Sequence, residues 1–369
     1  MKVLVVKTFD YSLDSWKKTG TLDRELSLYK ELNSKYKINF TLLSWSDFEA
    51  VEDLSEYGIK ILPIYSEINL SNSKAIRFVK SLIIPFKIKS YLRDIDIIKQ
   101  NQLFGSWFSI ILKIILRKPL FIRTGYDMYQ FSKYENKNIF KQFMYRLLTK
   151  ISLVFSDFYS VSSDTDLKKY DNKKVGLRQN WVLNNDYFPI KNRSLGKVLS
   201  VGRLEKQKDF KYLIEEISGL NIQLDIVGEG SEKLDLQNFA DQKKVKVNFL
   251  GNVNHEDLED LYKEYCLYVS SSNYEGNPKT VLEALSFGCV TILSNIPNHR
   301  ELVDHSKSGF IFDKEKGSLK LMFESILNNK FDLNSISREG FNYVQKNNSL
   351  QQSVDAEMKD YNYLLQKRR

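Results

Sequence analysis

Two glutamates frame the stretch in which this sequence concentrates its chemistry. Glu275 and Glu283 lie eight residues apart, and Gly276-Asn277-Pro278 follows the first of them directly. The apolar run 266–269 before them predicts a strand, and the glycine-proline turn predicts that a helix begins at Pro278, which lacks only an N–H that has no partner there. Because the start of a helix presents N–H groups and the positive end of its dipole, we expect a phosphate to bind at this turn.

The two carboxylates would then lie on either side of that phosphate. A helix rises 1.5 Å per residue, so Glu283 lies roughly 7.5 Å beyond the helix start, while Glu275 precedes it. A nucleotide sugar, with a diphosphate between two hydroxyl-bearing groups, matches this layout. The spacing of the two glutamates alone favours the alternative that both lie on a solvated helix face. The strand–loop–helix setting and a second motif instead favour a phosphate-binding site.

The second motif follows the predicted strand 197–201 and reads Gly202-Arg203-Leu-Glu-Lys-Gln-Lys208. Gly202 permits a tight turn, and Arg203 and Lys208 can both reach beyond the carboxyl end of the strand, where open α/β sheets bind ligands. A guanidinium fork and a lysine charge are suited to a leaving diphosphate. The alternative is a solvated basic loop, which we prefer for Lys206.

Together the two motifs resemble those of retaining glycosyltransferases of family 4, also called glycosyl transferases group 1. The resemblance covers roughly residues 197–312 and, more loosely, the whole chain. It implies an α/β protein of the GT-B fold, in which two Rossmann-like, doubly wound domains face an interdomain cleft. It also implies a metal-independent, retaining hexosyltransferase without a cofactor, whose substrate is a nucleotide sugar, with UDP as the expected nucleotide.

The resemblance also assigns roles to individual residues. Glu275, Arg203 and Lys208 would be catalytic, with Glu275 holding hydroxyls of the donor sugar and Glu283 holding the ribose. The remaining donor contacts are expected from glycines and from the turn before the helix: Gly20, Gly202, Gly228, Glu229, Gly230, Gly276, Asn277, Pro278, Lys279, Thr280 and Val281.

For two of these assignments the residues themselves give weaker support or allow another explanation. Gly228-Glu229-Gly230 follows a strand but lacks the third glycine of a dinucleotide fingerprint, so the resemblance alone places it at the nucleotide. Gly20 precedes the predicted helix 21–32, where simple capping by Thr21 is an equal explanation.

The first half departs from the family pattern, because no histidine follows either of its middle strands. Asn101 and Asp127 occupy the corresponding stretches and are our candidates for contacts to the sugar or the acceptor. The departure leaves the donor sugar and any catalytic group in this half open.

Short apolar strands alternate with amphipathic helices along the chain, which predicts parallel sheets. The polar stretch 184–196 interrupts this alternation. We therefore expect an acceptor-binding domain over residues 1–190, a donor-binding domain over 191–348, and a C-terminal helix over 349–369 that crosses back to the first domain.

The net charge of +9 is concentrated in the first half. Residues 68–150 contain 16 Lys and Arg but only 4 Asp and Glu. This excess predicts an anionic partner, and the interleaved apolar residues indicate peripheral contact with an anionic membrane; packed helices with a lysine-rich outer face are the alternative. No nucleic-acid-binding module is recognisable.

Several classes of protein and site are disfavoured by composition. The three histidines form no cluster with cysteines, so no metal site is expected, and Cys266 and Cys289 lie in apolar runs as small buried side chains. No run approaches the ~20 apolar residues of a membrane span. We expect a cytoplasmic protein, peripheral on the cytoplasmic face of the inner membrane.

The predicted activity is transfer of a sugar to a saccharide or lipid-linked acceptor in the biosynthesis of a bacterial surface polysaccharide, such as capsule, O-antigen or lipopolysaccharide. A sugar-nucleotide epimerase on the same scaffold and a non-catalytic nucleotide-sugar-binding protein are the alternatives. The donor sugar, acceptor, linkage and oligomeric state stay open.

Overall fold

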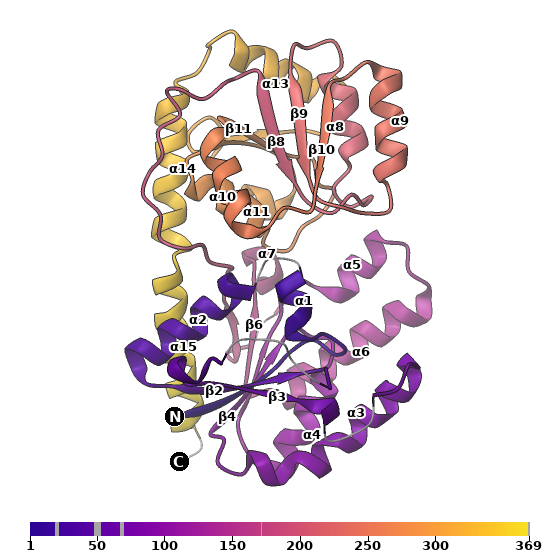
Figure 1. Cartoon of the computed structure of the whole chain (residues 1–369), viewed down its shortest axis with the longest axis vertical. Coiled ribbons are helices and arrows are strands. Elements are labelled where there is room, and N and C mark those ends of the chain that lie inside the picture. Colours follow the sequence, from indigo (N-terminus) through magenta and orange to yellow (C-terminus); the bar gives the residue numbers. More distant parts are fainter. Residues whose placement is uncertain (19–21, 48–52, 67–69, 171, 368–369) are drawn as a thin grey trace. The chain divides into compact units, whose positions relative to one another are not determined.

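The computed structural model describes residues 1–18, 22–47, 53–66, 70–170 and 172–367. The chain forms two compact units (Figure 1): unit 1 comprises residues 1–179 and 351–369, and unit 2 comprises residues 180–350. The predicted boundary falls after residue 190, whereas the contacts divide the chain after Gln179. Asn180 already belongs to unit 2, because its backbone N–H donates to Oδ1 of Asn277 over 2.8 Å.

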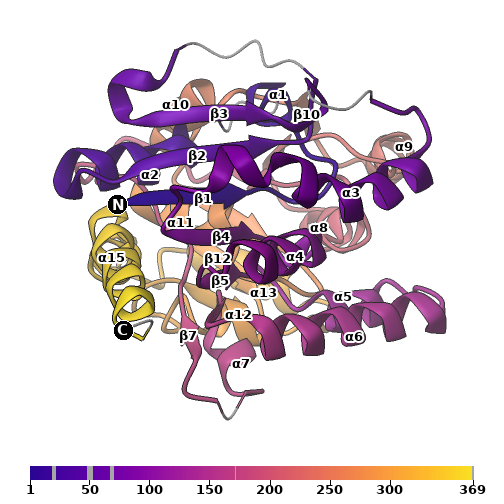
Figure 2. The same ribbon diagram turned by 90° about the horizontal axis from the view of Figure 1, so that it is seen from below.

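Unit 1 contains a seven-stranded parallel sheet in the order β3-β2-β1-β4-β5-β6-β7. Figure 2 shows β3, β2, β1 and β4 side by side in that order. The strands are β1 (Lys2–Val6), β2 (Asn39–Ser44), β3 (Ile59–Pro63), β4 (Ile97–Asn101), β5 (Leu120–Arg123), β6 (Phe158–Val161) and β7 (Val175–Leu177). The helices are α1 (Leu13–Lys18), α2 (Leu22–Tyr36), α3 (Lys74–Ile88), α4 (Ser106–Leu116), α5 (Met128–Tyr134), α6 (Ile139–Phe155), α7 (Asp164–Leu167) and α15 (Leu350–Gln366).

Unit 2 contains a six-stranded parallel sheet in the order β10-β9-β8-β11-β12-β13. Its strands are β8 (Lys197–Val201), β9 (Gln223–Val227), β10 (Val247–Gly251), β11 (Leu267–Ser270), β12 (Val290–Ser294) and β13 (Phe310–Phe312). Its helices are α8 (Phe210–Ile217), α9 (Lys233–Lys243), α10 (His255–Glu264), α11 (Lys279–Ser286), α12 (Pro297–Arg300), α13 (Ser318–Leu327) and α14 (Leu333–Asn347).

The central strands are apolar on both faces, as parallel sheets covered by helices require. All four residues of β11 and all five of β12 are buried. In both sheets the strand order reverses beside the first strand of the unit, which is the doubly wound arrangement of Rossmann-like domains. The structure therefore confirms the predicted fold class of each half.

Buried ion pairs attach α15 to unit 1. Lys99 on β4 is 1% exposed and pairs with Glu357, and Arg178 pairs with Asp360. Burial lowers the pKa of Lys99, although Glu357 opposes that effect. Removing Lys99 or Glu357 would leave a buried charge without compensation, so this pair helps to fix where α15 packs.

Cys266 and Cys289 are both free and buried, as predicted. Burial raises the pKa of Cys266 to about 11 and that of Cys289 to about 12, so both thiols stay protonated at neutral pH. Over the described part of the chain, no helix has the length and apolar character needed to cross a membrane.

Candidate functional site

The two predicted motifs meet at the carboxyl edge of the unit 2 sheet. Strand β8 leads into Gly202 and Arg203, and its neighbour β11 leads into the loop that carries Glu275. Strands β8 and β11 are neighbours in the sheet. The strand that follows β8 in sequence, β9, lies on one side of this pair, and β12, which follows β11, lies on the other side. Loops that diverge from such a switch point leave a crevice between them, which is where open α/β sheets bind ligands.

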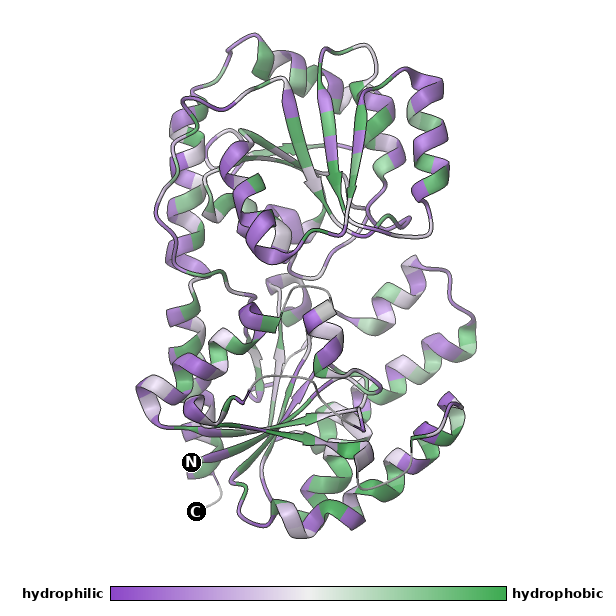
Figure 3. Cartoon of the chain, in the orientation of Figure 1, coloured by the Kyte–Doolittle hydropathy of each residue, from purple (hydrophilic) through white to green (hydrophobic). Residues whose placement is uncertain are grey.

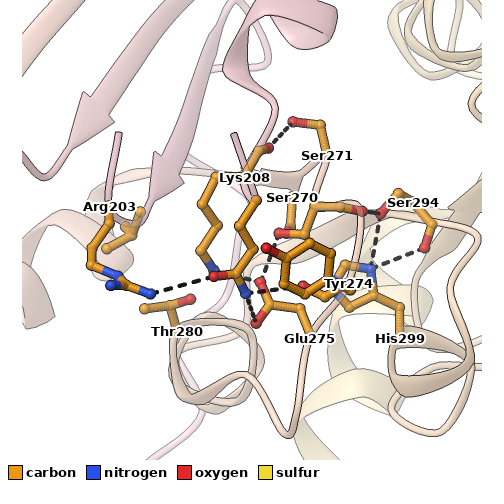
Figure 4. Close-up of polar contacts among 12 residues, drawn as sticks. Arg203, Lys208, Ser270, Ser271, Tyr274, Glu275, Thr280, Ser294 and His299 are labelled. Atoms are coloured by element: carbon orange, nitrogen blue, oxygen red, sulfur yellow. Dashed lines mark hydrogen bonds and ion pairs between the residues drawn. The ribbon is translucent and has the colours of Figure 1, made fainter. Parts of the chain in front are cut away.

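Lys208 and Glu275 form a direct ion pair in this place. Nζ of Lys208 lies 2.5 Å from Oε1 of Glu275, and both side chains are largely buried. Gly202 makes the approach possible, because a β-carbon there would lie 2.8 Å from Cε of Lys208. Figure 4 shows Lys208 and Glu275 pointing toward one another, with Arg203 and Thr280 nearby.

Two neutral side chains complete the setting of Glu275. Ser272 donates its hydroxyl to Oε1 over 2.7 Å, and Nε2 of Gln207 lies 3.4 Å from Oε2 and 3.0 Å from the carbonyl oxygen of Tyr274. Burial alone would raise the pKa of Glu275, but Lys208 and the hydrogen bonds hold it below its ordinary value. Glu275 is therefore an oriented carboxylate at neutral pH, able to accept hydrogen bonds from hydroxyls.

His299, which the sequence analysis did not select, is buried in the same region. It lies in α12, after the strand next to β11, and its Nδ1 is 2.9 Å from the carbonyl oxygen of Ser294. Because a carbonyl only accepts, the Nδ1 carries the proton. Among the described residues, no group hydrogen-bonds to Nε2 of His299. Burial lowers the pKa of His299 to about 4, although the nearby Glu275 opposes that shift.

This histidine predicts a pH-dependent stability. With a pKa of about 4 in the fold and about 6.5 when unfolded, the unfolded chain binds more protons between these values. The contribution is complete above about pH 7 and is lost as the pH falls, by about 2 kcal/mol between pH 7.5 and 5.0. Urea unfolding at both pH values should show that His299→Gln loses less stability on acidification than the parent protein. His305→Gln, at an exposed position, is the control; equal losses in all three proteins would contradict the assignment.

Arg203 contributes a second positive charge, and its side chain is less tightly held than that of Lys208. Its side chain is exposed, and its contact to Gln207, from Nη2 to Oε1, is long at 3.4 Å. The structure thus places Arg203 beside the Lys208–Glu275 pair without fixing it to a carboxylate there. An exposed guanidinium at this edge can close onto a bound anion.

Helix α11 begins at Lys279, one residue later than predicted, and Pro278 is its N-cap in an extended conformation. Pro278 cannot cap the helix through its side chain, so the amides of the first turn point out of the helix start. The turn before it is fixed from both sides, because Asn180 bonds to Asn277 and Nδ2 of Asn298 donates to the carbonyl of Gly276 over 2.6 Å. The predicted turn is thus a rigid platform at the positive end of a helix.

The first turn of α11 divides its side chains between the core and the edge of the sheet. Val281 is fully buried, and the hydroxyl of Tyr268 donates to Oγ1 of Thr280 over 3.0 Å. The ammonium of Lys279 lies 4.9 Å from the ring centre of Trp181. The side chains of this turn therefore serve mainly to hold it, and its predicted contacts with a donor stay predictions.

Glu283 lies further along α11 and in a different environment from Glu275. It is buried, and Oε2 lies 3.3 Å from the Tyr262 hydroxyl. Nε2 of His255 on α10 lies 3.7 Å from Oε1. The structure therefore supplies two separately held carboxylates, one before and one within α11, as the spacing predicted. Tyr262 and His255 were not predicted, because they reach Glu283 from another helix.

Gly228-Glu229-Gly230 lies against the Gly202 turn. The N–H of Gly228 donates to the carbonyl of Gly251 over 2.7 Å, and the N–H of Leu204 donates to the carbonyl of Glu229 over 3.0 Å. The Glu229 side chain itself pairs with Lys233 at 2.7 Å. These contacts give the turn a structural function at the strand ends, and its predicted contact with a nucleotide stays a prediction.

Gly228→Ala is expected to destabilise unit 2 strongly. Gly228 has a φ of 138°, and a β-carbon there would lie 2.1 Å from the carbonyl oxygen of Gly202. Strain and overlap together should cost roughly 3 kcal/mol or more. Gly317→Ala is the matched control, because Gly317 also has a positive φ, of 84°, but nothing lies within 4 Å of its β-carbon position. Urea unfolding should show only about 1 kcal/mol for this control; similar losses in both variants would contradict the steric explanation.

The unit 1 candidates make their contacts within their own unit. Asp127 caps α5 by accepting from the N–H of Gln130 over 3.0 Å and pairs with Lys169 at 3.0 Å. Asn101 ends β4, and its Nδ2 donates to the Tyr29 hydroxyl over 2.8 Å. Gly20 lies outside the described residues. Their predicted contacts with substrate stay predictions.

No three His, Cys, Asp or Glu side chains gather as a metal site would require, within the ranges that the structure describes. The positive charge at the site comes instead from Arg203, Lys208 and the start of α11. This is a set of groups that can bind phosphate oxygens.

Residues 189–343 match the family described as glycosyl transferases group 1. The matched residues make up most of unit 2. Among similar proteins, an uncharacterized glycosyltransferase of Haemophilus influenzae is 34% identical over 125 residues, which are 32% of this chain and 35% of that protein. The chain thus spans about a third of that relative's length.

Two longer matches are more distant in sequence. The Campylobacter jejuni GalNAc-α-(1→4)-GalNAc-α-(1→3)-diNAcBac-PP-undecaprenol α-1,4-N-acetyl-D-galactosaminyltransferase is 27% identical over 68% of this chain and 67% of its own. The O-antigen biosynthesis glycosyltransferase WclY of Escherichia coli is 24% identical over 80% of this chain and 82% of its own.

Solved structures show the same fold along the whole chain. The sucrose-phosphate synthase of Thermosynechococcus elongatus matches with a TM-score of 0.80 at 15% identity, covering 100% of both chains. HepE (Alr3699) of Anabaena, solved with UDP and glucose, matches with a TM-score of 0.76 at 15% identity, covering 98% of this chain and 100% of its own. These likenesses establish the predicted GT-B fold, with its two Rossmann-like domains.

Proposed function

We propose that this protein transfers a sugar from a nucleotide-sugar donor, with UDP as the expected nucleotide, to a saccharide or lipid-linked acceptor. The observation that carries the proposal is the Lys208–Glu275 pair at the switch point of unit 2, next to the start of α11. The family match of residues 189–343 supports transfer as the reaction class.

In this proposal the diphosphate lies against the amides at the start of α11. Arg203 and Lys208 bind its oxygens, Glu283 accepts hydrogen bonds from the ribose, and Glu275 accepts them from the donor sugar. As the bond between the sugar carbon and the phosphate oxygen breaks, negative charge grows on the leaving nucleotide. Fixed donors aimed at that charge accelerate the reaction, each by about 10²- to 10³-fold.

We further propose that the reaction retains the configuration of the sugar and needs no metal ion. Arg203, Lys208 and the helix start supply the positive charge that a metal would otherwise supply. The acceptor hydroxyl attacks the sugar carbon from the side that the nucleotide leaves. Its proton passes to an oxygen of the departing phosphate, so the products are the glycoside and the nucleoside diphosphate.

The relatives suggest the setting of this reaction. The C. jejuni relative is named for a substrate linked through diphosphate to undecaprenol, and the E. coli relative is named for O-antigen biosynthesis. We propose by analogy that the acceptor here is a growing, lipid-linked saccharide of a bacterial surface polysaccharide.

A panel of nucleotide sugars tests the donor proposal. A donor at 100 times its dissociation constant should add about 2.7 kcal/mol of stability, visible as a rise in the melting temperature. The stabilising donor should then be consumed only when an acceptor is present, and equally well with a chelator. Isomerisation of the donor without acceptor would identify an epimerase, and binding without any turnover would identify a sensor.

A further inference from the structure

Two helices of unit 1 expose apolar stripes to solvent where amphipathic helices normally bury them. On α3 the exposed apolar residues recur at three- and four-residue steps: Ile76, Val79, Ile83 and Phe86, with Phe78 and Leu82 beside them. On α6 they are Ile139, Phe140, Phe143, Met144, Leu147, Ile151, Val154 and Phe155. Phe86 is 55% exposed, Phe140 71% and Val154 73%, so more than half of each residue is open to the solvent.

These stripes belong to one side of unit 1. Helix α4 joins α3 and α6, because Nε1 of Trp107 donates to Oγ of Ser81 over 2.9 Å and the hydroxyls of Ser106 and Ser152 are 2.8 Å apart. Figures 1 and 2 agree that α3 and α6 extend from the same side of the unit, and Figure 3 shows hydrophobic residues along both. Soluble proteins rarely expose so many large apolar side chains together unless they bind something.

The charges around the stripes identify the kind of partner. Helices α3, α4 and α6 contain no Asp or Glu. They contain eight Lys and Arg, namely Lys74, Arg77, Lys80, Lys87, Lys113, Lys141, Arg146 and Lys150. Arg77 is paired with Asp10, and Lys113 with Asp157. Others are exposed near the apolar stripes, among them Lys87, Lys141 and Lys150.

We propose that α3 and α6 form a docking surface for an anionic lipid bilayer. The phenylalanine and isoleucine side chains would enter the boundary between headgroups and acyl chains, while the lysines contact anionic headgroups. A second copy of this chain fits less well, because a symmetric dimer through this face would set the basic helices against each other. A bilayer supplies both the hydrocarbon and the negative charge that the surface lacks.

Flotation of the purified full-length protein with lipid vesicles tests this surface. The protein should bind vesicles that contain phosphatidylglycerol and bind pure phosphatidylcholine vesicles at least about 100-fold more weakly. The triple variant Phe86→Ser/Phe140→Ser/Phe143→Ser should lower the partition coefficient by at least about tenfold. Lys87→Gln/Lys141→Gln/Lys150→Gln should lower it by roughly 100-fold on the anionic vesicles.

Matched controls change exposed residues in unit 2. Leu234 and Leu321 are 68% and 65% exposed, and Leu234→Ser/Leu321→Ser should bind vesicles like the parent protein. Lys244→Gln/Lys246→Gln/Lys330→Gln, also at exposed positions, controls for the loss of charge. Equal melting temperatures would show that all variants fold.

Absence of vesicle binding by the parent protein, or equal binding by the α3/α6 variants and the controls, would overturn the proposal. So would a dimer, seen by sedimentation, that the serine variants abolish. Turnover with a water-soluble acceptor is expected to be the same in every variant. Loss of vesicle binding with normal turnover therefore separates this surface from the transfer reaction.

Discussion

Lys208→Met is expected to lower turnover by about 10²-fold or more and to destabilise the protein by about 3 kcal/mol. The activity is lost because the leaving diphosphate no longer meets the ammonium. Stability is lost because the buried Glu275 loses the partner 2.5 Å away, which offsets the cost of burying its carboxylate. Steady-state transfer rates and urea unfolding measure the two effects. Lys206→Met, in the same loop at an exposed position, should change neither.

The double variant Lys208→Met/Glu275→Gln separates the two functions of this pair. A neutral amide no longer leaves a buried charge unpaired, so most of the lost stability should return. Turnover should stay low, because both the phosphate ligand and the sugar ligand are absent. Recovery of turnover in the double variant, or a single variant that works within threefold of the parent rate, would contradict our assignment of Lys208.

Arg203→Ala is expected to lower turnover by about 10²-fold while changing the free energy of unfolding by no more than about 0.5 kcal/mol. The second expectation follows from the exposure of Arg203 and the length of its contact to Gln207, which is 3.4 Å. Arg203→Lys should recover only part of the rate, because an ammonium cannot bind two phosphate oxygens as a fork does.

Arg338→Ala is the matched control for this experiment. Arg338 is also exposed, and its guanidinium lies 4.3 Å from the ring centre of Tyr187, on α14 rather than at the edge of the sheet. Its removal should leave the rate unchanged. A rate for Arg203→Ala equal to that of this control would remove Arg203 from the site.

Local sequence predicted most of unit 2 because its strands are continuous apolar runs that end at glycine or polar residues. The predicted strand 197–201 coincides with β8, and the predicted strand 266–269 lies within one residue of β11 at each end. The edge strands β7 and β13 were not predicted, because each has only three residues and pairs with one neighbour. Helix α1 likewise was not predicted, since six residues are too few to show a helical period.

The sequence could predict those site residues that lie together on one continuous segment of the chain. Glu275 and Glu283 lie on one strand–loop–helix unit, and Arg203 and Lys208 lie on another, so spacing reveals both pairs. His299 reaches the site through the packing of α12, which no local pattern specifies. One signal was present: His299 follows β12, and the carboxyl ends of neighbouring parallel strands share one edge of the sheet.

The central claim is that a diphosphate binds at the start of α11 between Arg203 and Lys208, and a crystal structure with bound UDP tests it most directly. The account predicts phosphate oxygens within hydrogen-bonding distance of both side chains and of the amides at positions 279–281, with the ribose at Glu283. An ordered UDP bound elsewhere, with these side chains unchanged from their present contacts, would contradict it.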